Sequence, residues 1–165
     1  MHMNKRSSPA ASGVDETMRI AQSPVALDDC GMAAAAHLLG DRWILLILRS
    51  ALYGVSRFED LQRELSISRG VLSAKLSALV DAGLLERKAY REEGARARTQ
   101  YVPSAAAREL VIVFAALMQW GDKWVRREPA ALNFVDKESG APLKVSFVTP
   151  GGRAVALERV TAKQE

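Results

Sequence analysis

The sequence predicts a mainly α-helical fold with a small β wing, a long C-terminal helix that serves dimerisation, and an extra C-terminal β-hairpin. Three observations lead to this prediction. Residues that begin and end helices divide the segment 30–82 into short apolar helices. The hydrophobic period then changes to that of two strands around an arginine-rich segment. An apolar stripe at helical spacing follows over 104–128.

Length and composition limit the class of protein. The chain has 165 residues, of which 48% are apolar and 25% charged, as in globular proteins. This length suits one domain with an appendage. No apolar run reaches the ~18 residues that a membrane span needs, and the N-terminus lacks the apolar stretch of a signal peptide. We therefore expect a cytoplasmic protein without a membrane partner, and a disordered leader over residues 1–22, which are rich in Ser, Ala, Pro and Gly.

Polar side chains at helix starts and glycines at helix ends define the first helices. Asp41 and Ser68 are predicted N-caps, because a short oxygen-bearing side chain accepts hydrogen bonds from the free N–H groups of a first turn. Ser56 and Glu59 have the spacing of a capping box. Gly83 is predicted to end the fourth helix. The predicted helices cover residues 30–39, 42–53, 57–65 and 69–82.

Strands and a long helix complete the predicted fold. Residues 84–90 and 99–103 are predicted strands that flank the polar segment 91–98. A single long helix is expected over 104–128. Its apolar stripe is broader than one small domain can cover, which predicts a homodimer. The predicted C-terminal hairpin pairs 132–135 with 143–148, so we divide the chain into the leader, a domain over 30–128 and an extension over 129–165.

Helix, helix, tight turn, helix and hairpin in this order predict a winged helix-turn-helix. Its last helix, 69–82, would enter the major groove of double-stranded DNA, and the wing would lie along phosphates. The predicted contacts from the helix and its cap are Ser68, Arg69, Gly70, Ser73, Ala74, Lys75 and Ser77. Those from the wing are Arg91, Arg96 and Arg98.

Charge favours the same partner. Segment 30–128 holds fifteen Lys and Arg against eleven Asp and Glu, whereas the rest of the chain holds eight of each. A basic excess in the domain itself favours nucleic acid. The alternative is a winged helix that serves only as a protein-interaction module and does not bind DNA. Steep salt dependence of DNA binding separates the two.

Several segments resemble the HxlR family of bacterial transcriptional regulators. They are Leu39–Leu48, Arg57–Leu61, Ile67-Ser68 with Leu72-Ser73 and Leu76, Gly83–Arg87, Tyr101, Trp120-Gly121 and the cysteine at position 30. The resemblance implies homodimers on operator DNA, mostly repressors and sometimes activators, that respond to small molecules or thiol-reactive signals. Gly31 stands where the family usually has proline, and Pro103-Ser104 where it has Leu-Thr. Residues 129–165 extend beyond the family's minimal domain.

Cys30 has two interpretations. In the first turn of a helix its thiolate would be stabilised by the helix dipole, as in a redox sensor. The acidic neighbours Asp28 and Asp29 oppose that ionisation. The alternative is a small apolar residue packed at the dimer contact, which is the common place of a free cysteine.

Other chemistry has little support in the sequence. Trp120 and Trp124 are interpreted as packing residues, with an effector pocket beside them as the alternative. Two histidines and one cysteine do not make a closed metal site. The chain has no Gly-rich phosphate loop, metalloprotease motif or nucleophile elbow. We therefore expect no enzyme activity, no metal and no cofactor.

Overall fold

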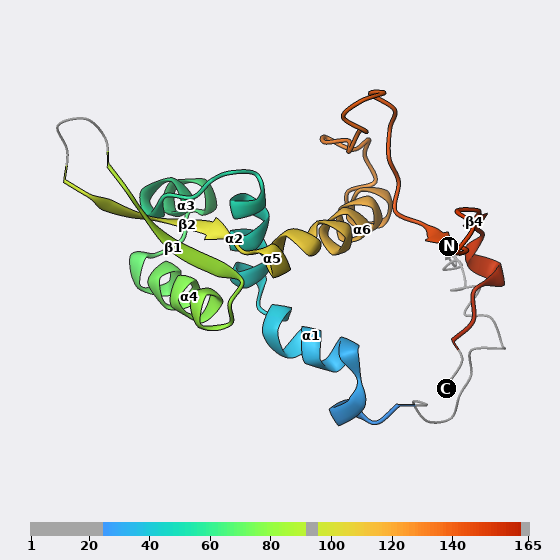
Figure 1. Ribbon diagram of the computed structural model, residues 1–165, viewed down its shortest axis with the longest axis horizontal. Coiled ribbons are helices and arrows are strands. Elements are labelled where there is room, and N and C mark those ends of the chain that lie inside the picture. The colour runs from blue at the N-terminus through green and yellow to red at the C-terminus, as the bar shows by residue number, and fades with distance from the viewer. Residues whose placement is uncertain (1–24, 92–95, 163–165) are drawn as a thin grey trace, which may run out of the picture.

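A winged-helix body lies at one end of the molecule, and two extensions leave it at the other (Figure 1). The computed structural model describes residues 25–91 and 96–162, so the predicted leader lies outside the described residues. One extension is a helix before the body, and the other follows the last helices of the chain. The body consists of α2 (Arg42–Leu52), α3 (Phe58–Leu65), α4 (Arg69–Asp81), β1 (Leu85–Tyr90) and β2 (Arg98–Pro103).

Apolar side chains at helical spacing form the core of the body. Leu72, Leu76 and Leu79 are fully buried on one side of α4, as their spacing of three to four residues predicts. They pack in one cluster with Ile47 and Leu48 of α2. Each such side chain contributes about 1.5–3 kcal/mol through burial, so this cluster fixes how α4 is presented to solvent.

Two predicted N-caps are confirmed and the capping box is wrong. The Asp41 carboxylate accepts hydrogen bonds from the N–H groups of Trp43 and Ile44 at 2.8 and 3.1 Å. The Ser68 hydroxyl accepts one from the Val71 N–H at 3.4 Å. The hydroxyl of Ser56 does not cap α3, because it donates to Gln100 in β2 at 3.2 Å. The N-cap residue of α3 is Arg57, without a side-chain cap.

The wing is an antiparallel pair attached to the start of α3. Its register runs from Leu85 opposite Pro103 to Tyr90 opposite Arg98. Arg57 forms a further bridge to β2, and the Tyr101 N–H donates to the Ser56 carbonyl at 2.7 Å. The wing is therefore tied to the helix-turn-helix through backbone hydrogen bonds.

The predicted single helix after the wing is divided into three parts. They are α5 (Ala105–Glu109), α6 (Val111–Gly121) and the π-helical turn η3 (Asp122–Arg126). Leu110 interrupts the first two, because its N–H donates to Ala107, three residues back, at 3.2 Å. The Ser104 hydroxyl caps α5 by accepting from the Ala107 N–H at 3.2 Å. Arg127, at φ +57°, ends the helical segment.

The C-terminal extension has β pairing, although not in the predicted register. We call residues 129–162 the arm. Val135 forms a bridge to Pro142, just before the predicted second strand, and the Leu143 N–H donates a hydrogen bond to the Phe134 carbonyl. Residues 147–148 pair instead with 154–155. The proline has no N–H with which to extend the ladder. Instead, a turn with Gly152 at φ +78° joins two short strands, β3 (Phe147–Val148) and β4 (Ala154–Val155), and η4 (Leu157–Arg159) follows.

Helix α1 (Gly31–Leu39), with the short turn η2 (Leu27–Asp29) before it, forms the N-terminal extension. It ends at Gly40, where a Cβ atom would lie 2.5 Å from the Ala36 carbonyl oxygen, so the junction requires glycine. The chain bends by 85° between α1 and α2. In the described part of the chain no single helix is long and apolar enough to cross a membrane. Helices α1 and α2 reach the length and apolar composition of a membrane span only when the bent pair is taken together.

Candidate nucleic-acid interface

The exposed face of α4 is small and polar. The side opposite the buried leucines carries Gly70, Ser73 and Ala74, all exposed. Ser68, the cap, is exposed as well, and Ser77 is half-buried. Small side chains allow a helix backbone to approach base edges closely, and serine can donate or accept a hydrogen bond there. The predicted helix contacts are thus brought together on one accessible strip.

Two cationic residues of this helix are held by neighbouring elements. The Arg69 guanidinium lies over the Phe58 ring of α3, 5.0 Å from its centroid. The Lys75 ammonium donates to the Asp41 carboxylate at 2.7 Å. That hydrogen bond, together with the two from the first turn of α2, lowers the pKa of Asp41 below its ordinary value. In the free protein Lys75 therefore braces α4 against the start of α2 rather than extending freely into solvent.

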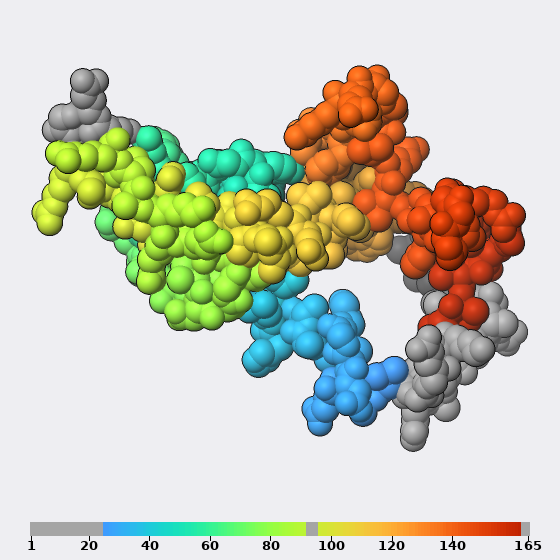
Figure 2. Space-filling model, viewed as in Figure 1, coloured from blue at the N-terminus to red at the C-terminus, as the bar shows by residue number. Residues whose placement is uncertain are grey.

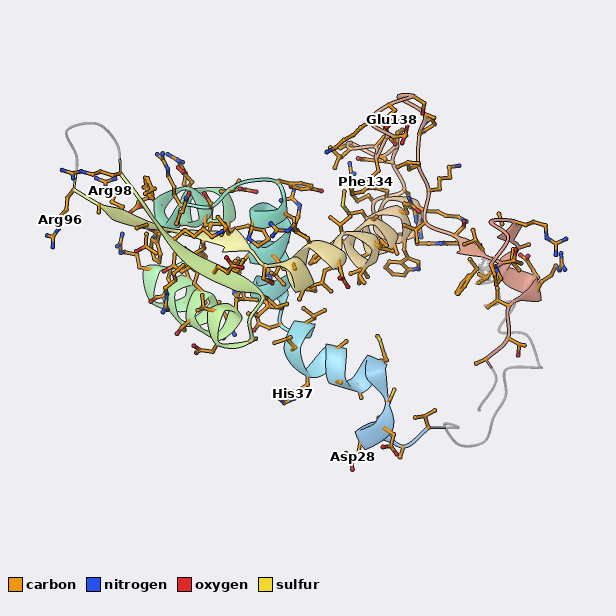
Figure 3. All side chains as sticks on the ribbon, viewed as in Figure 1. Asp28, His37, Arg96, Arg98, Phe134 and Glu138 are labelled. Carbon is orange, nitrogen blue, oxygen red and sulfur yellow. The ribbon has the colours of Figure 1, made fainter. Side chains whose placement is uncertain are left out.

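The wing presents arginines at its tip. Arg98 occupies the last rung of the hairpin and Arg96 lies beyond it, and both point outward (Figure 3). Both are exposed, as is Arg91. Within 25–91 and 96–162 no ion pair involves Arg96 or Arg98. Arg96 and Arg98 are therefore available to phosphates without the loss of an ion pair within these ranges.

Arg57 is a candidate contact that sequence reasoning missed. Its guanidinium lies over the Tyr90 ring, 4.6 Å from the centroid, between the start of α3 and the wing. The aromatic ring at the end of a predicted strand was a usable signal, but the pairing depends on the tertiary register. Figure 1 shows that α3, α4 and the wing lie at the same end of the molecule. This end therefore has the two parts that a winged helix-turn-helix uses on DNA.

Comparison with known proteins agrees with this geometry. The model of the HxlR-like helix-turn-helix family matches residues 38–129. The chain belongs to this family. An HTH-type transcriptional regulator from Mycobacterium tuberculosis is 39% identical over 120 residues, which are 73% of this chain and 68% of the relative. The protein is accordingly a DNA-binding transcription regulator of the winged helix-turn-helix type.

Solved structures of other transcription regulators extend the likeness beyond the family domain. The Pseudomonas aeruginosa protein PA1374, described as a transcription factor, is 34% identical, with a TM-score of 0.57 over 82% of this chain and 92% of its own. PA1607, described likewise, is 26% identical, with a TM-score of 0.68 over 82% of this chain and 95% of its own. The reduced form of the regulator YodB from Bacillus subtilis is 26% identical and covers 59% of this chain and 96% of its own, with a TM-score of 0.51. The first two likenesses span more of the chain than the family model does.

The predicted sensor and effector residues lie away from this interface. Cys30 is the partly exposed N-cap residue of α1. Trp120 lines a groove of about 710 Å³ between α6 and the arm. Trp124 does not line it, and its ring lies 4.7 Å from the Lys123 ammonium. The two tryptophans, each 59% exposed, therefore do not form one pocket.

A second cavity, which sequence reasoning did not find, lies between α2 and the end of α6. It has a volume of about 690 Å³ and is lined by Tyr53, Met118 and Val125, with Arg49 and Asp122 among its polar residues. Both cavities fall in the size range of small-molecule sites. No group of His, Cys, Asp and Glu suited to a metal ion occurs among the described residues.

Proposed function

We propose that the protein is a homodimeric repressor that binds operator DNA through α4 and the wing. The observation that carries the proposal is the exposed small, polar strip of α4 beside the outward arginines of the wing. The strip would read base edges in the major groove, and the wing would hold the phosphate backbone. The proposed contacts are Ser68, Arg69, Gly70, Ser73, Ala74, Lys75 and Ser77 on α4 and its N-cap, and Arg91, Arg96 and Arg98 on the wing.

These residues would contribute to DNA binding in two ways, through the N-terminus of α4 and through cationic side chains that are already held in place. Ser68 lies at the N-terminus of a 13-residue helix, where free N–H groups and the helix dipole favour a phosphate. Arg69 and Lys75, each held by a neighbour, are oriented before DNA arrives. The exchange of Lys75 from Asp41 to a phosphate would strengthen binding at the cost of the bracing contact.

The proposed homodimer is supported by apolar residues that one copy leaves exposed. Ile112 is 65% exposed on α6, and Trp120 and Val125 are similarly exposed. A patch of this kind marks an interaction surface. A two-fold dimer places two copies of α4 on one face of the duplex. Sedimentation at micromolar concentration is expected to give twice the 18.0 kDa of the chain, and a monomer would contradict the proposal.

Release of the repressor from DNA is proposed to follow reaction with a thiol-reactive compound or binding of a small molecule. Cys30 is the candidate for the first, and its partial exposure would admit a reagent. YodB, a structural relative, is known in a reduced form, which agrees with a thiol signal. A small molecule would bind near the end of α6 and near η3, the elements that hold Trp120 and Trp124. Two cavities open in this region, and Trp120 lines one of them.

DNA selection tests the proposal most directly. Fragments of the source genome that the protein retains at moderate salt would be sequenced. The expected result is an inverted repeat with half-sites about 34 Å, one helical turn, or a multiple of it apart. A reporter placed behind that operator should be silenced by the protein. Retention of no preferred sequence, with binding insensitive to salt, would favour the protein-interaction module instead.

A further inference from the structure

The cavity between α2 and the end of α6 lies where two parts of the molecule meet. Arg49 and Tyr53 of α2 line one side, Met118 of α6 and Val125 of η3 line the other, and Leu132 of the arm completes the wall. Figure 2 shows the first part of the arm, in orange, standing up from α6 beside the winged-helix body. A ligand in this cavity would therefore contact both the body and the C-terminal extension.

The charged side chains of this cavity differ in how well they are paired. Arg126 donates to the carboxylates of Asp122 at 2.6 Å and Glu128 at 2.9 Å, so the lining charges of Arg126 and Asp122 neutralise each other. Arg49 donates a single N–H to the Glu64 carboxylate at 3.2 Å, and among the described residues it has no other ion pair. A guanidinium has five N–H donors. Arg49 is therefore the cation of this cavity with the capacity to hold an added anion.

The rest of the lining is mainly apolar and accessible. The Tyr53 ring lies under the Arg49 guanidinium, 4.9 Å from its centroid. The Tyr53 hydroxyl donates to the Met118 sulfur at 3.2 Å, which is a weak acceptor that a ligand oxygen could replace. Val125 and Leu132 are 65% and 45% exposed, so an apolar ligand would remove their surface from water. The lining thus suits a molecule with an apolar body and one negative group.

We propose that this cavity binds a small apolar carboxylate, which Arg49 holds in exchange for Glu64. The inference rests on the proposed function and names the chemical class of its small molecule. A carboxylate can accept two parallel N–H bonds from a guanidinium, whereas Glu64 accepts one. The buried Ser50 hydroxyl donates to the same Glu64 oxygen at 2.9 Å. Glu64 therefore keeps a partner when Arg49 turns to the ligand.

The exchange connects the cavity to the helix-turn-helix. Glu64 lies in the last turn of α3, directly before the turn that leads to α4. The ion pair of Arg49 with Glu64 joins α2 to this end of α3. A ligand that breaks the pair binds one arrangement of α3 better than the other, which is the difference in affinity that a conformational shift requires. The carboxylate should therefore weaken operator binding.

Calorimetric titration of the full-length protein without DNA tests the cavity. The probes are naphthoate and octanoate, each compared with its uncharged alcohol, naphthalenemethanol or octanol. The variants are Arg49→Gln and Glu64→Gln, and the second keeps an oxygen that can accept from Ser50. The matched control is Arg63→Gln, which removes a cation from an exposed ion pair with Asp60 on α3, outside the cavity.

Opposite responses are expected from the two partners of the ion pair. The carboxylates should bind Arg49→Gln at least about tenfold more weakly than wild type or Arg63→Gln, because the charge-assisted pair is lost. They should bind Glu64→Gln more tightly than wild type, because the ligand no longer competes for Arg49. The alcohols should bind all four proteins alike. Equal binding of acid and alcohol, or equal loss in the Arg49 and Glu64 variants, would overturn the proposal.

Operator binding with and without naphthoate separates this proposal from the proposed function. Saturating naphthoate should lower the operator affinity of the wild type about tenfold, a usual size of allosteric coupling, and should leave that of Arg49→Gln unchanged. Operator affinity that naphthoate does not alter in the wild type would overturn the link to α3 and leave the repressor standing. A failure to bind any operator without probe would overturn the proposed function, and the titrations without DNA would still decide the cavity.

Discussion

Removal of the two wing arginines gives the sharpest test of the DNA-binding surface. Arg96→Ala with Arg98→Ala should leave the fold intact, because both side chains are exposed and neither has an ion pair within the described ranges. Surface changes of this kind alter stability by no more than about 0.5 kcal/mol. Loss of DNA binding would then report contacts rather than unfolding.

The size of the effect follows from counterion release. In a dimer the double substitution removes two arginines from each of two wings, so up to four phosphate contacts are lost. Each contact contributes about 0.9 to the slope of log K against log salt, and the slope should fall by about 3.6. Between about 50 and 200 mM salt the wild type should therefore lose roughly 150-fold more affinity than the variant. If only one arginine per wing contacts phosphate, the difference in slope is about 1.8 and the factor about 12.

The assay is a fluorescence-anisotropy titration of an operator duplex and a scrambled duplex at several salt concentrations. Affinity should fall on both duplexes, because phosphate contacts carry no sequence information. The matched control is Arg153→Ala with Arg159→Ala, which removes the same charge from exposed positions in the arm, at the end opposite the wing (Figure 1). An unchanged slope in the wing variant, or an equal change in the control, would refute the assignment of the wing.

Signals that act over a few residues allowed the elements of the body to be predicted. Asp41 and Ser68 cap helices because their partners are the next turn of the same chain segment. The period of Leu72, Leu76 and Leu79 located the buried side of α4, and so located the opposite, exposed side. The division of the last helix at Leu110 had no such signal, since neither glycine nor proline lies next to it.

Contacts between distant residues are the part that sequence spacing could not supply. Ser56 and Glu59 have the capping-box pattern, but Gln100, 44 residues away, takes the Ser56 hydroxyl. The Lys75 ammonium likewise finds Asp41, 34 residues before it. For Ser56 the distant partner takes the place of the predicted cap, and for Lys75 it adds a contact within the free protein that local spacing could not predict. The exposed residues around them were easier to predict, because their side chains mainly contact solvent.

The remaining predictions concern the exposed strip, the thiol and the brace of α4. Ala74→Glu should abolish binding to all duplexes, since it places a carboxylate against phosphates, while circular dichroism stays unchanged. Cys30→Ser should keep reduced-state affinity within about tenfold, or ~1.4 kcal/mol, and a Cys30 switch predicts that peroxide or a quinone releases the wild type alone. Equal release of both would leave a small molecule as the signal.

Asp41→Asn should lower Tm at pH 7, because asparagine no longer forms an ion pair with Lys75. Asparagine still caps α2, so the substitution tests the charge alone. The pKa of Asp41 is lowered from 3.8 in the fold, chiefly by the Lys75 hydrogen bond. The ionised carboxylate therefore stabilises the fold above the unfolded pKa, and this contribution is lost as the pH falls through the folded one. The Tm difference between wild type and Asp41→Asn should then be full at neutral pH and should close as the pH falls below the ordinary pKa of an aspartate and through the lower pKa of Asp41 in the fold. Asp81→Asn, at an exposed position on α4, is the control and should not lower Tm comparably at neutral pH. A difference that persists in acid would mean that cap geometry, and not the charge on Asp41, holds α4 in place.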